Sequence, residues 1–191
     1  MVEHRAMRGE ELKAFFGAVP EDRIAAYLLS TTDGLRKAEL RRLLVGDVAL
    51  SPGEGQLPHV RIRKTTAKNK RAHTLPLHPQ VVPFLTPLVE GREARESLFL
   101  AGLPTHETFA RDVERAGLVR ETPEGLLTWT SLRKGLATVL DEAHVPEGLR
   151  QKVMRHATAG SRAGSTRSTA SGRWPWRSRS STWCRSSAGC R

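Results

Sequence analysis

Tyrosine, cysteine and long apolar runs are scarce in this sequence. Its 191 residues include one tyrosine, Tyr27, and two cysteines, Cys184 and Cys190, which both lie near the C-terminus. We therefore expect neither a disulfide framework nor a cysteine-based metal site. The longest apolar patch, residues 81–89, is interrupted by two prolines and is too short to cross a membrane. The charged N-terminus does not resemble a secretory signal, so the sequence predicts a cytoplasmic protein.

Positive charge dominates the composition but is unevenly distributed. The formal net charge is +11, of which residues 161–191 supply +7 through seven arginines and no acidic residue, leaving +4 for residues 1–160. A mildly basic body of this kind fits a polyanionic partner such as nucleic acid, although many unrelated soluble proteins are equally basic.

The composition changes abruptly at the start of residues 161–191. This segment contains nine serines, seven arginines and three of the four tryptophans, and it lacks Leu, Ile, Val, Phe and Met. Such a segment cannot bury a core, so we expect disorder there. The mixture is also what a GC-rich gene yields when it is read out of frame, which suggests a frameshift after about Ala159. The sequence therefore predicts a folded domain over residues 1–160 and a disordered Ser/Arg-rich tail over residues 161–191.

Hydrophobic spacing over residues 1–160 predicts a mainly helical domain with one small sheet, an α+β fold. Apolar residues recur at helical intervals in several segments, and short segments between them have the composition of strands. We expect three strands in one antiparallel sheet, with the polar turn 64–71 between the second and the third. The expected helices are 8–16, 21–31, 35–45, 79–88, 105–116, 130–143 and 147–156, and the expected strands are 47–50, 59–63 and 73–77.

Three segments place an arginine or a histidine at or near an end of an expected helix. They read Gly34-Leu-Arg-Lys-Ala-Glu-Leu40, Thr128-Trp-Thr-Ser-Leu-Arg133 and Gln151-Lys-Val-Met-Arg-His-Ala-Thr158. Taken alone, each has an ordinary explanation: Arg36 as a solvent-facing residue, Glu39 as a paired surface charge, and His156 as a helix-terminal dipole partner. Taken together, arginines and a histidine on successive helices can converge on one phosphate, because a guanidinium fork grips two oxygens and stays charged.

In order and spacing these segments resemble the active-site frame of the tyrosine recombinases (phage integrase family), over roughly residues 5–160. The first resembles the box Gly-Leu-Arg-x-x-Glu-Leu, and the second resembles Phe-His-x-Leu-Arg. The third resembles the box in which Leu-Gly-His-x follows a helix that opens with Val-Pro. The resemblance implies a catalytic domain that cuts and rejoins DNA strands in site-specific recombination or integration, without metal or ATP.

The resemblance also implies a role for the matching residue in each box. Arg36 and Arg133 would stabilise the phosphate in the transition state. Glu39 would act behind Arg36, as a carboxylate that orients it. His156 would contact the scissile phosphate and assist proton transfer. The other histidines of the sequence, His73 among them, carry no functional signal.

A strongly basic turn lies between the second and third expected strands. The segment 61–77 reads RIRKTTAKNKRAHTLPL and resembles the family's strand-turn-strand, Thr-Lys-x-x-x-x-Arg-x-x-Pro-Leu. The resemblance implies that one turn lysine protonates the leaving 5′ oxygen; the spacing favours Lys68, with Lys64 and Lys70 as alternatives. A solvated basic hairpin without a role is the other interpretation. The cations expected to contact DNA here are Arg63, Lys64, Lys70 and Arg71.

The sequence departs from the family at two catalytic positions. Thr130 stands where the second box usually has histidine; threonine carries no charge, and we interpret it as the N-cap of the helix that begins there. The nucleophilic tyrosine, expected near Ser165, is absent. Tyr27 has apolar neighbours in an early helix, so we predict that it is a core residue.

We therefore expect an integrase-like protein of a mobile element that is inactive as written, because it lacks the nucleophile. Its expected partner is double-stranded DNA, in a bacterial cytoplasm and associated with the nucleoid. Full-length relatives would assemble as tetramers on DNA, whereas this chain is expected to be monomeric. Two alternatives stay open: a non-catalytic DNA-binding module, and a basic RNA-binding or interaction protein in which Arg36, Arg133 and His156 need not converge.

Overall fold

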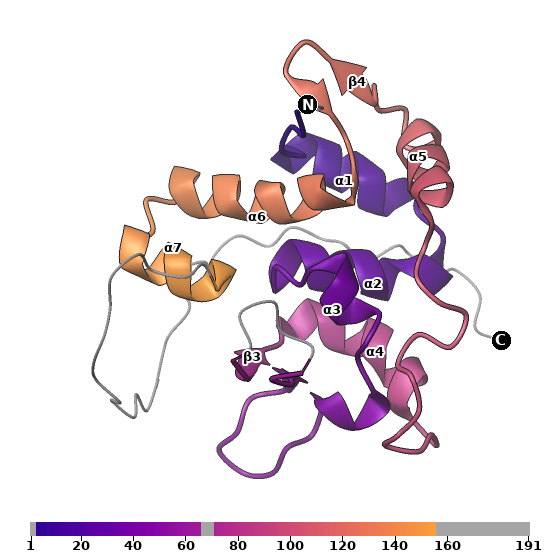
Figure 1. Cartoon of the computed structure of the whole chain (residues 1–191), viewed down its shortest axis with the longest axis vertical. Helices are drawn as coiled ribbons and strands as arrows, with labels where there is room; N and C mark the ends of the chain where they lie inside the picture. Colours follow the sequence, from indigo (N-terminus) through magenta and orange to yellow (C-terminus); the bar gives the residue numbers. More distant parts are fainter. Residues whose placement is uncertain (1–2, 66–70, 156–191) are drawn as a thin grey trace, which may run out of the picture. The chain divides into compact units, whose positions relative to one another are not determined.

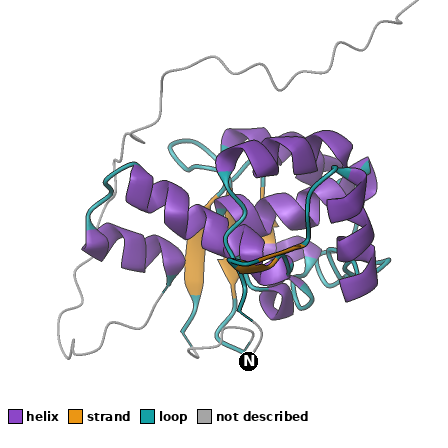
Figure 2. Ribbon diagram, turned by 90° about the horizontal axis from the view of Figure 1, so that it is seen from above, coloured by secondary structure: helices purple, strands orange, loops and turns teal. Residues whose placement is uncertain are grey.

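Helices make up about half of the described chain, with a few short strands among them (Figures 1 and 2). The computed structural model describes residues 3–65 and 71–155. The mainly helical α+β fold with a small antiparallel sheet is confirmed. The helices are α1 (Gly9–Ala18), α2 (Glu21–Thr32), α3 (Lys37–Leu40), α4 (Val82–Val89), α5 (His106–Arg115), α6 (Trp129–Glu142) and α7 (Glu147–Met154), with the 3-10 turns η1 (Val45–Asp47) and η2 (Pro79–Val81). The strands are β1 (Val48–Ala49), β2 (His59–Ile62), β3 (His73–Pro76), β4 (Glu121–Thr122) and β5 (Gly125–Leu126).

The main sheet has the order β1-β2-β3, and both pairings are antiparallel. Val60 of β2 pairs with Val48 on one side and with Leu75 on the other. Val60 and Ile62 are fully buried whereas Arg61 between them is exposed, which is the alternation expected of a strand with one face on the core. The chain between β2 and β3 contains the basic turn.

The helix expected over 35–45 is much shorter in the structure. Only Lys37–Leu40 is α-helical, and the chain then runs beside the segment 94–98. Val45 N–H donates to the carbonyl of Glu96 at 2.9 Å, and Gly46 N–H donates to that of Ala94 at 2.9 Å. The expectation of a long helix was therefore wrong, because these tertiary hydrogen bonds outweigh the helical spacing of the leucines.

A small hairpin, β4–β5, was not predicted from the sequence. It forms next to the N-terminal segment, where Leu126 N–H donates to the carbonyl of Glu3 at 2.8 Å. Gly125 has a φ of +124°, and a Cβ there would lie 2.6 Å from the Glu3 carbonyl oxygen, so only glycine fits. The two strands of two residues each are too short to show alternation in the sequence.

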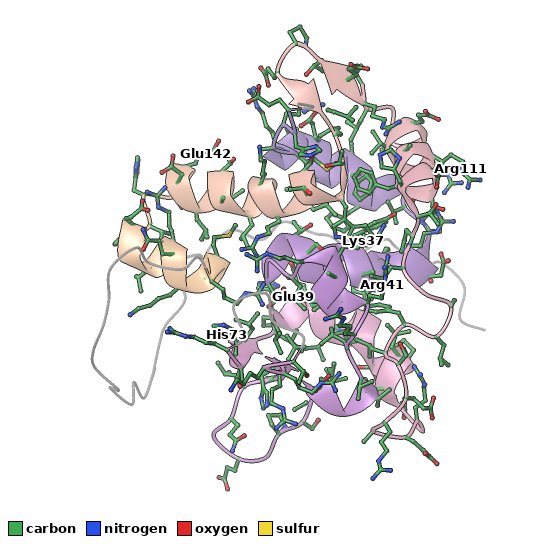
Figure 3. All side chains as sticks on the ribbon, in the orientation of Figure 1. Lys37, Glu39, Arg41, His73, Arg111 and Glu142 are labelled. Carbon is green, nitrogen blue, oxygen red and sulfur yellow. The ribbon has the colours of Figure 1, made fainter. Side chains whose placement is uncertain are left out.

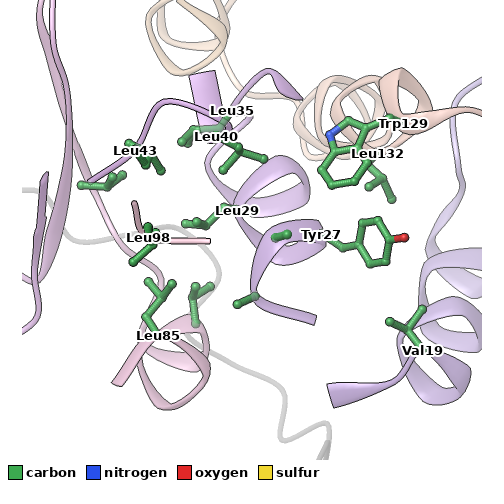
Figure 4. Close-up of a cluster of buried hydrophobic side chains, with 14 of the residues drawn as sticks. Val19, Tyr27, Leu29, Leu35, Leu40, Leu43, Leu85, Leu98, Trp129 and Leu132 are labelled. Carbon is green, nitrogen blue, oxygen red and sulfur yellow. The ribbon is translucent and has the colours of Figure 1, made fainter. Parts of the chain in front are cut away.

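Helix α2 lies at the centre of the core, in contact with α6 on one side and with α4 on the other (Figure 1). Towards α6 and α5 the core is aromatic: the Tyr27 ring centroid lies 5.1 Å from Phe15, 5.8 Å from Phe109 and 4.9 Å from Trp129. Towards the sheet and α4 it is built of leucines, several of which are drawn in Figure 4. Tyr27 is fully buried, which confirms its prediction as a core residue.

Helix α6 is held on two sides, and this fixes the direction of its first turns. The indole Nε1 of Trp129 donates to the hydroxyl of Ser30 in α2 at 2.8 Å. The Lys37 ammonium of α3 lies 4.9 Å from the centroid of the Trp129 ring. At Gly135 a Cβ would come within 2.6 Å of the Met7 carbonyl oxygen, so the N-terminal segment packs directly on the helix backbone.

None of the helices in the described ranges is both long and apolar enough to span a membrane.

Candidate active site

Arg36 and Glu39 form a local unit at the start of α3. Arg36 is the N-cap residue of this helix, and its backbone N–H donates to Glu39 Oε2 at 2.9 Å. Its guanidinium Nη1 donates to the other carboxylate oxygen, Oε1, at 3.2 Å. The Glu39 side chain is 4% exposed, whereas that of Arg36 is 31% exposed. The carboxylate thus holds the arginine from the protein side while the guanidinium reaches solvent.

Arg133 ties together three segments that are far apart in the sequence. It lies in the second turn of α6, and its guanidinium is buried. Nη1 donates to the carbonyl of Gly34, in the turn before Arg36, and Nη2 donates to the carbonyl of Met154, at the end of α7. The pKa of Arg133 is lowered to about 10, chiefly by burial and in addition by the neighbouring cations Arg36 and Arg155, while Glu39 opposes them.

Arg155 is a third arginine at the same place. It follows the last residue of α7 in the left-handed conformation, with a φ of 52°. Its Nη2 donates to the Gly34 carbonyl at 2.7 Å and to Glu39 Oε2 at 3.0 Å. Burial is the largest influence on its pKa and lowers it, although Glu39 acts in the opposite direction.

Positive charge exceeds negative charge in this group, which we call the arginine cluster: Arg36, Arg133 and Arg155. Glu39 is its direct carboxylate partner. Asp33 lies nearby in the preceding turn, but burial raises its pKa to about 7, against the weaker effects of the Thr32 hydroxyl and Arg155. At neutral pH Asp33 is therefore only partly charged. An excess of buried positive charge favours binding of an anion.

The structure brings some of the predicted site residues together and places others elsewhere. Arg36, Glu39 and Arg133 meet in the arginine cluster. Arg63 instead forms an ion pair with Asp47 at 3.1 Å and donates to the Arg42 carbonyl at 2.6 Å. Lys64 and Arg71 are exposed at the two ends of the basic turn. The predictions for Lys68, Lys70, His156 and the position of Ser165 fall outside the described residues.

The interpretation of Thr130 as a helix N-cap was wrong. The cap of α6 is Thr128, whose extended backbone precedes the helix and whose N–H donates to the Ser131 hydroxyl at 2.9 Å. Thr130 is the second residue of the helix and is exposed. The helix begins earlier than expected because Trp129 is buried against α2 and is itself helical.

Sequence reasoning missed Arg155 and His73. Arg155 occupies the position of the glycine in the third box, Leu-Gly-His, and this replacement was the available signal. Burial is the largest influence on the pKa of His73, at the start of β3, and lowers it. Arg155, Arg71 and Arg36 lower this pKa further, and Glu39 opposes them. These charges act on the ring from nearby, so His73 lies close to the arginine cluster; Figure 3 labels it together with Glu39. No sequence signal distinguished it from the other histidines.

Metal-binding side chains do not gather anywhere in the described ranges. No group of three or more His, Cys, Asp or Glu residues there is arranged to hold a metal ion. The chemistry that the described site offers is electrostatic, through guanidinium groups.

Comparisons with known proteins identify the family. The family model described as "Phage integrase family" matches residues 5–162. The fold is similar to the integrase from mycobacterium phage Brujita, with a TM-score of 0.60, 22% identity, and coverage of 82% of this chain and 50% of that one. It is also similar to XerA recombinase, with a TM-score of 0.63, 16% identity, and coverage of 81% and 55%. None of the curated protein sequences matches this chain.

A further similar structure is that of a lambda integrase (75-356) dimer bound to a COC′ core site, with a TM-score of 0.59 and 18% identity. The match covers 82% of this chain and 59% of that one. This chain thus spans between half and three-fifths of the length of the three solved chains. The family match over most of the sequence shows that the chain belongs to the phage integrase family.

Proposed function

We propose that this chain is the phosphate-binding catalytic region of a site-specific DNA recombinase. The observation that carries the proposal is the meeting of Arg36 and Arg133, from two segments almost a hundred residues apart, in one cluster with excess positive charge. Two guanidinium groups at one point are suited to the non-bridging oxygens of a phosphodiester. Among the structurally similar proteins, lambda integrase is bound to DNA and XerH recombinase to a difH substrate, which supports double-stranded DNA as the partner.

Each residue of the cluster has a separate task in this proposal. Arg36, which reaches solvent, binds the scissile phosphate first, and Glu39 fixes its direction from behind. Arg133 is locked between two carbonyls and supplies a fixed charge where negative charge develops. Lys68 protonates the leaving 5′ oxygen, and His156 assists proton transfer. The DNA backbone is contacted by the basic turn through Lys64, Lys70 and Arg71, whereas Arg63 is held by Asp47.

The nucleophile is the part of the reaction that this sequence does not supply. Its one tyrosine, Tyr27, is fully buried, and its hydroxyl donates to Asp112 at 2.8 Å in the core. Burial and that hydrogen bond also raise the pKa of the Tyr27 hydroxyl, which disfavours the phenolate. We propose that the chain binds DNA as a monomer in the cytoplasm, at the nucleoid, without forming a covalent link.

DNA binding tests the proposal directly. The affinity of the full chain for a labelled DNA duplex is measured by fluorescence anisotropy over a range of salt concentrations. We expect Arg36→Gln to weaken binding by about tenfold, because one charge-assisted contact is lost. The matched control is Arg111→Gln, which removes the same charge from the exposed face of α5 (Figure 3). Equal effects of the two substitutions, or tighter binding of RNA than of DNA, would contradict the proposal.

Covalent chemistry is tested on a nicked duplex that traps a cleaved intermediate. Denaturing electrophoresis should show no protein–DNA adduct with this chain. An adduct would show that the chain does contain a nucleophile, and mapping the modified residue would then identify it.

A further inference from the structure

Arg155 is a buried cation whose hydrogen bonds are incomplete. Its side chain is 2% exposed, and Nη2 is fully used by Gly34 and Glu39. Nε and Nη1 have no hydrogen-bond partner within the part of the chain that the structure describes. These two nitrogens carry three N–H donors. Unsatisfied buried donors cost more stability in a charged group than in a neutral one, so the protein gives up stability at this point.

The backbone of Arg155 carries a second cost. Its φ of 52° places a long side chain in the left-handed region, where helices usually end with glycine. For a residue other than glycine this conformation is strained, because Cβ comes too close to the backbone carbonyl oxygen. Two unfavourable features at one residue beside a candidate active site indicate a function rather than a contribution to stability.

The guanidinium of Arg155 shares its acceptors with both other arginines of the cluster. It shares the Gly34 carbonyl with Arg133, and it shares Glu39 Oε2 with the backbone N–H of Arg36. The contacts of the three guanidinium groups therefore converge on the Gly34 carbonyl and the Glu39 carboxylate. Arg36 and Arg155 both lower the pKa of Arg133, and Arg36 also lowers that of Arg155. The solvent-reaching guanidinium of Arg36 marks the side from which an anion approaches.

We propose that Arg155 is a third phosphate ligand, whose unsatisfied N–H donors bind an oxygen of a phosphate held by Arg36 and Arg133. This inference rests on the proposed function in one respect, namely that the phosphate belongs to DNA. The same N–H donors would also bind free orthophosphate. The competing interpretation is a purely structural clamp, in which Arg155 only neutralises Glu39.

The test compares Arg155→Met with Arg150→Met. Both substitutions remove one arginine from the same stretch of chain and keep an unbranched apolar stem, but the ion-pair partners of Arg150 among the described residues are the exposed carboxylates of Asp141 and Glu147. Orthophosphate binding is measured by isothermal titration calorimetry, and duplex binding by fluorescence anisotropy. We expect Arg155→Met to weaken both by at least about tenfold and Arg150→Met to change them by less than about twofold. Unchanged orthophosphate affinity in Arg155→Met overturns the inference.

A second variant separates ligand binding from folding. Arg155→Gly relieves the backbone strain, so on our inference its Tm stays equal to or above that of the wild type while its phosphate affinity falls. A structural clamp predicts the reverse, a lower Tm with unchanged phosphate affinity, and that result overturns the inference even if Arg155→Met does not fold.

The two proposals can fail separately. If the wild type binds duplex DNA and Arg155→Met binds it equally well, the role of Arg155 is disproved and the proposed function stands. If the wild type binds orthophosphate through Arg155 but shows no binding to duplex DNA, the third ligand is supported and the recombinase function is contradicted. A wild type that binds neither disproves both.

Discussion

Asp112, in the aromatic half of the core, and Arg155, in the arginine cluster, are both buried charged side chains. They differ in how completely the protein satisfies their hydrogen bonds. Asp112 is fully buried, and it accepts hydrogen bonds from the Tyr27 hydroxyl at 2.8 Å, from Arg23 at 2.6 Å and from Arg115 at 3.2 Å. Arg155 is nearly as deeply buried, yet Nε and Nη1 lack acceptors in the described part of the chain.

The difference separates a group that holds the fold from a group that is prepared for a ligand. A buried carboxylate with opposite charges around it satisfies its desolvation cost within the protein. A buried guanidinium beside two others of the same charge does not recover this cost within the protein. On our inference, a bound anion supplies the hydrogen-bond acceptors that it lacks. The comparison also explains why Tyr27 is not available for chemistry, since its hydroxyl is part of the Asp112 network.

Removal of Asp112 should produce the largest effect on stability. Asp112→Ala leaves the Tyr27 hydroxyl without its acceptor and Arg23 without its buried partner, so we expect the free energy of unfolding to fall by about 3–5 kcal/mol. Urea denaturation measures this loss. The control is Asp22→Ala, because Asp22 also lies near Arg23, at 3.6 Å, but is 72% exposed. Phosphate affinity should not change in either variant, and a large loss of affinity in Asp112→Ala would break the distinction between the two regions.

Protonation of Asp33 should make stability depend on pH. Because burial raises its pKa from 3.8 to about 7, the folded state binds more protons than the unfolded state between these values. The free energy of unfolding should therefore fall as the pH rises from about 4 through 7. Asp33→Asn should remove this fall and be more stable than the wild type above pH 7 by up to about 4 kcal/mol, with no gain below pH 4.

The measurement for Asp33 is urea denaturation from pH 4 to pH 8. Glu142→Gln, at the exposed end of α6, is the control and should follow the wild type (Figure 3). Parallel pH profiles of the wild type and Asp33→Asn would show that Asp33 is not protonated by burial.

Tyr27→Phe should give the smallest effect. It removes one of the hydrogen bonds to Asp112 but keeps the ring and both arginine partners, so we expect a loss of about 1 kcal/mol. Thermal denaturation followed by circular dichroism measures it. DNA and phosphate binding should be unchanged, whereas weaker binding would connect the aromatic core to the arginine cluster and contradict the comparison.

Hydrophobic spacing predicted the fold class and most elements, since helices such as α2 and α5 carry their own apolar periodicity. It failed over 35–45, where hydrogen bonds to the segment 94–98 end the helix early. It also failed at Thr130, because burial of Trp129 against Ser30 places the start of α6 at Thr128. In each case the deciding contact comes from a distant part of the chain.

For the site, the sequence by itself determined the family, the convergence of Arg36 with Arg133, and the lack of an available tyrosine. These follow from motifs and residue identity. Only the tertiary structure decided that Arg155 joins them, because its acceptors, Gly34 and Glu39, lie 121 and 116 residues away along the chain. Burial, desolvation and unsatisfied donors are properties of such long-range neighbours, and a local pattern of residues does not contain them.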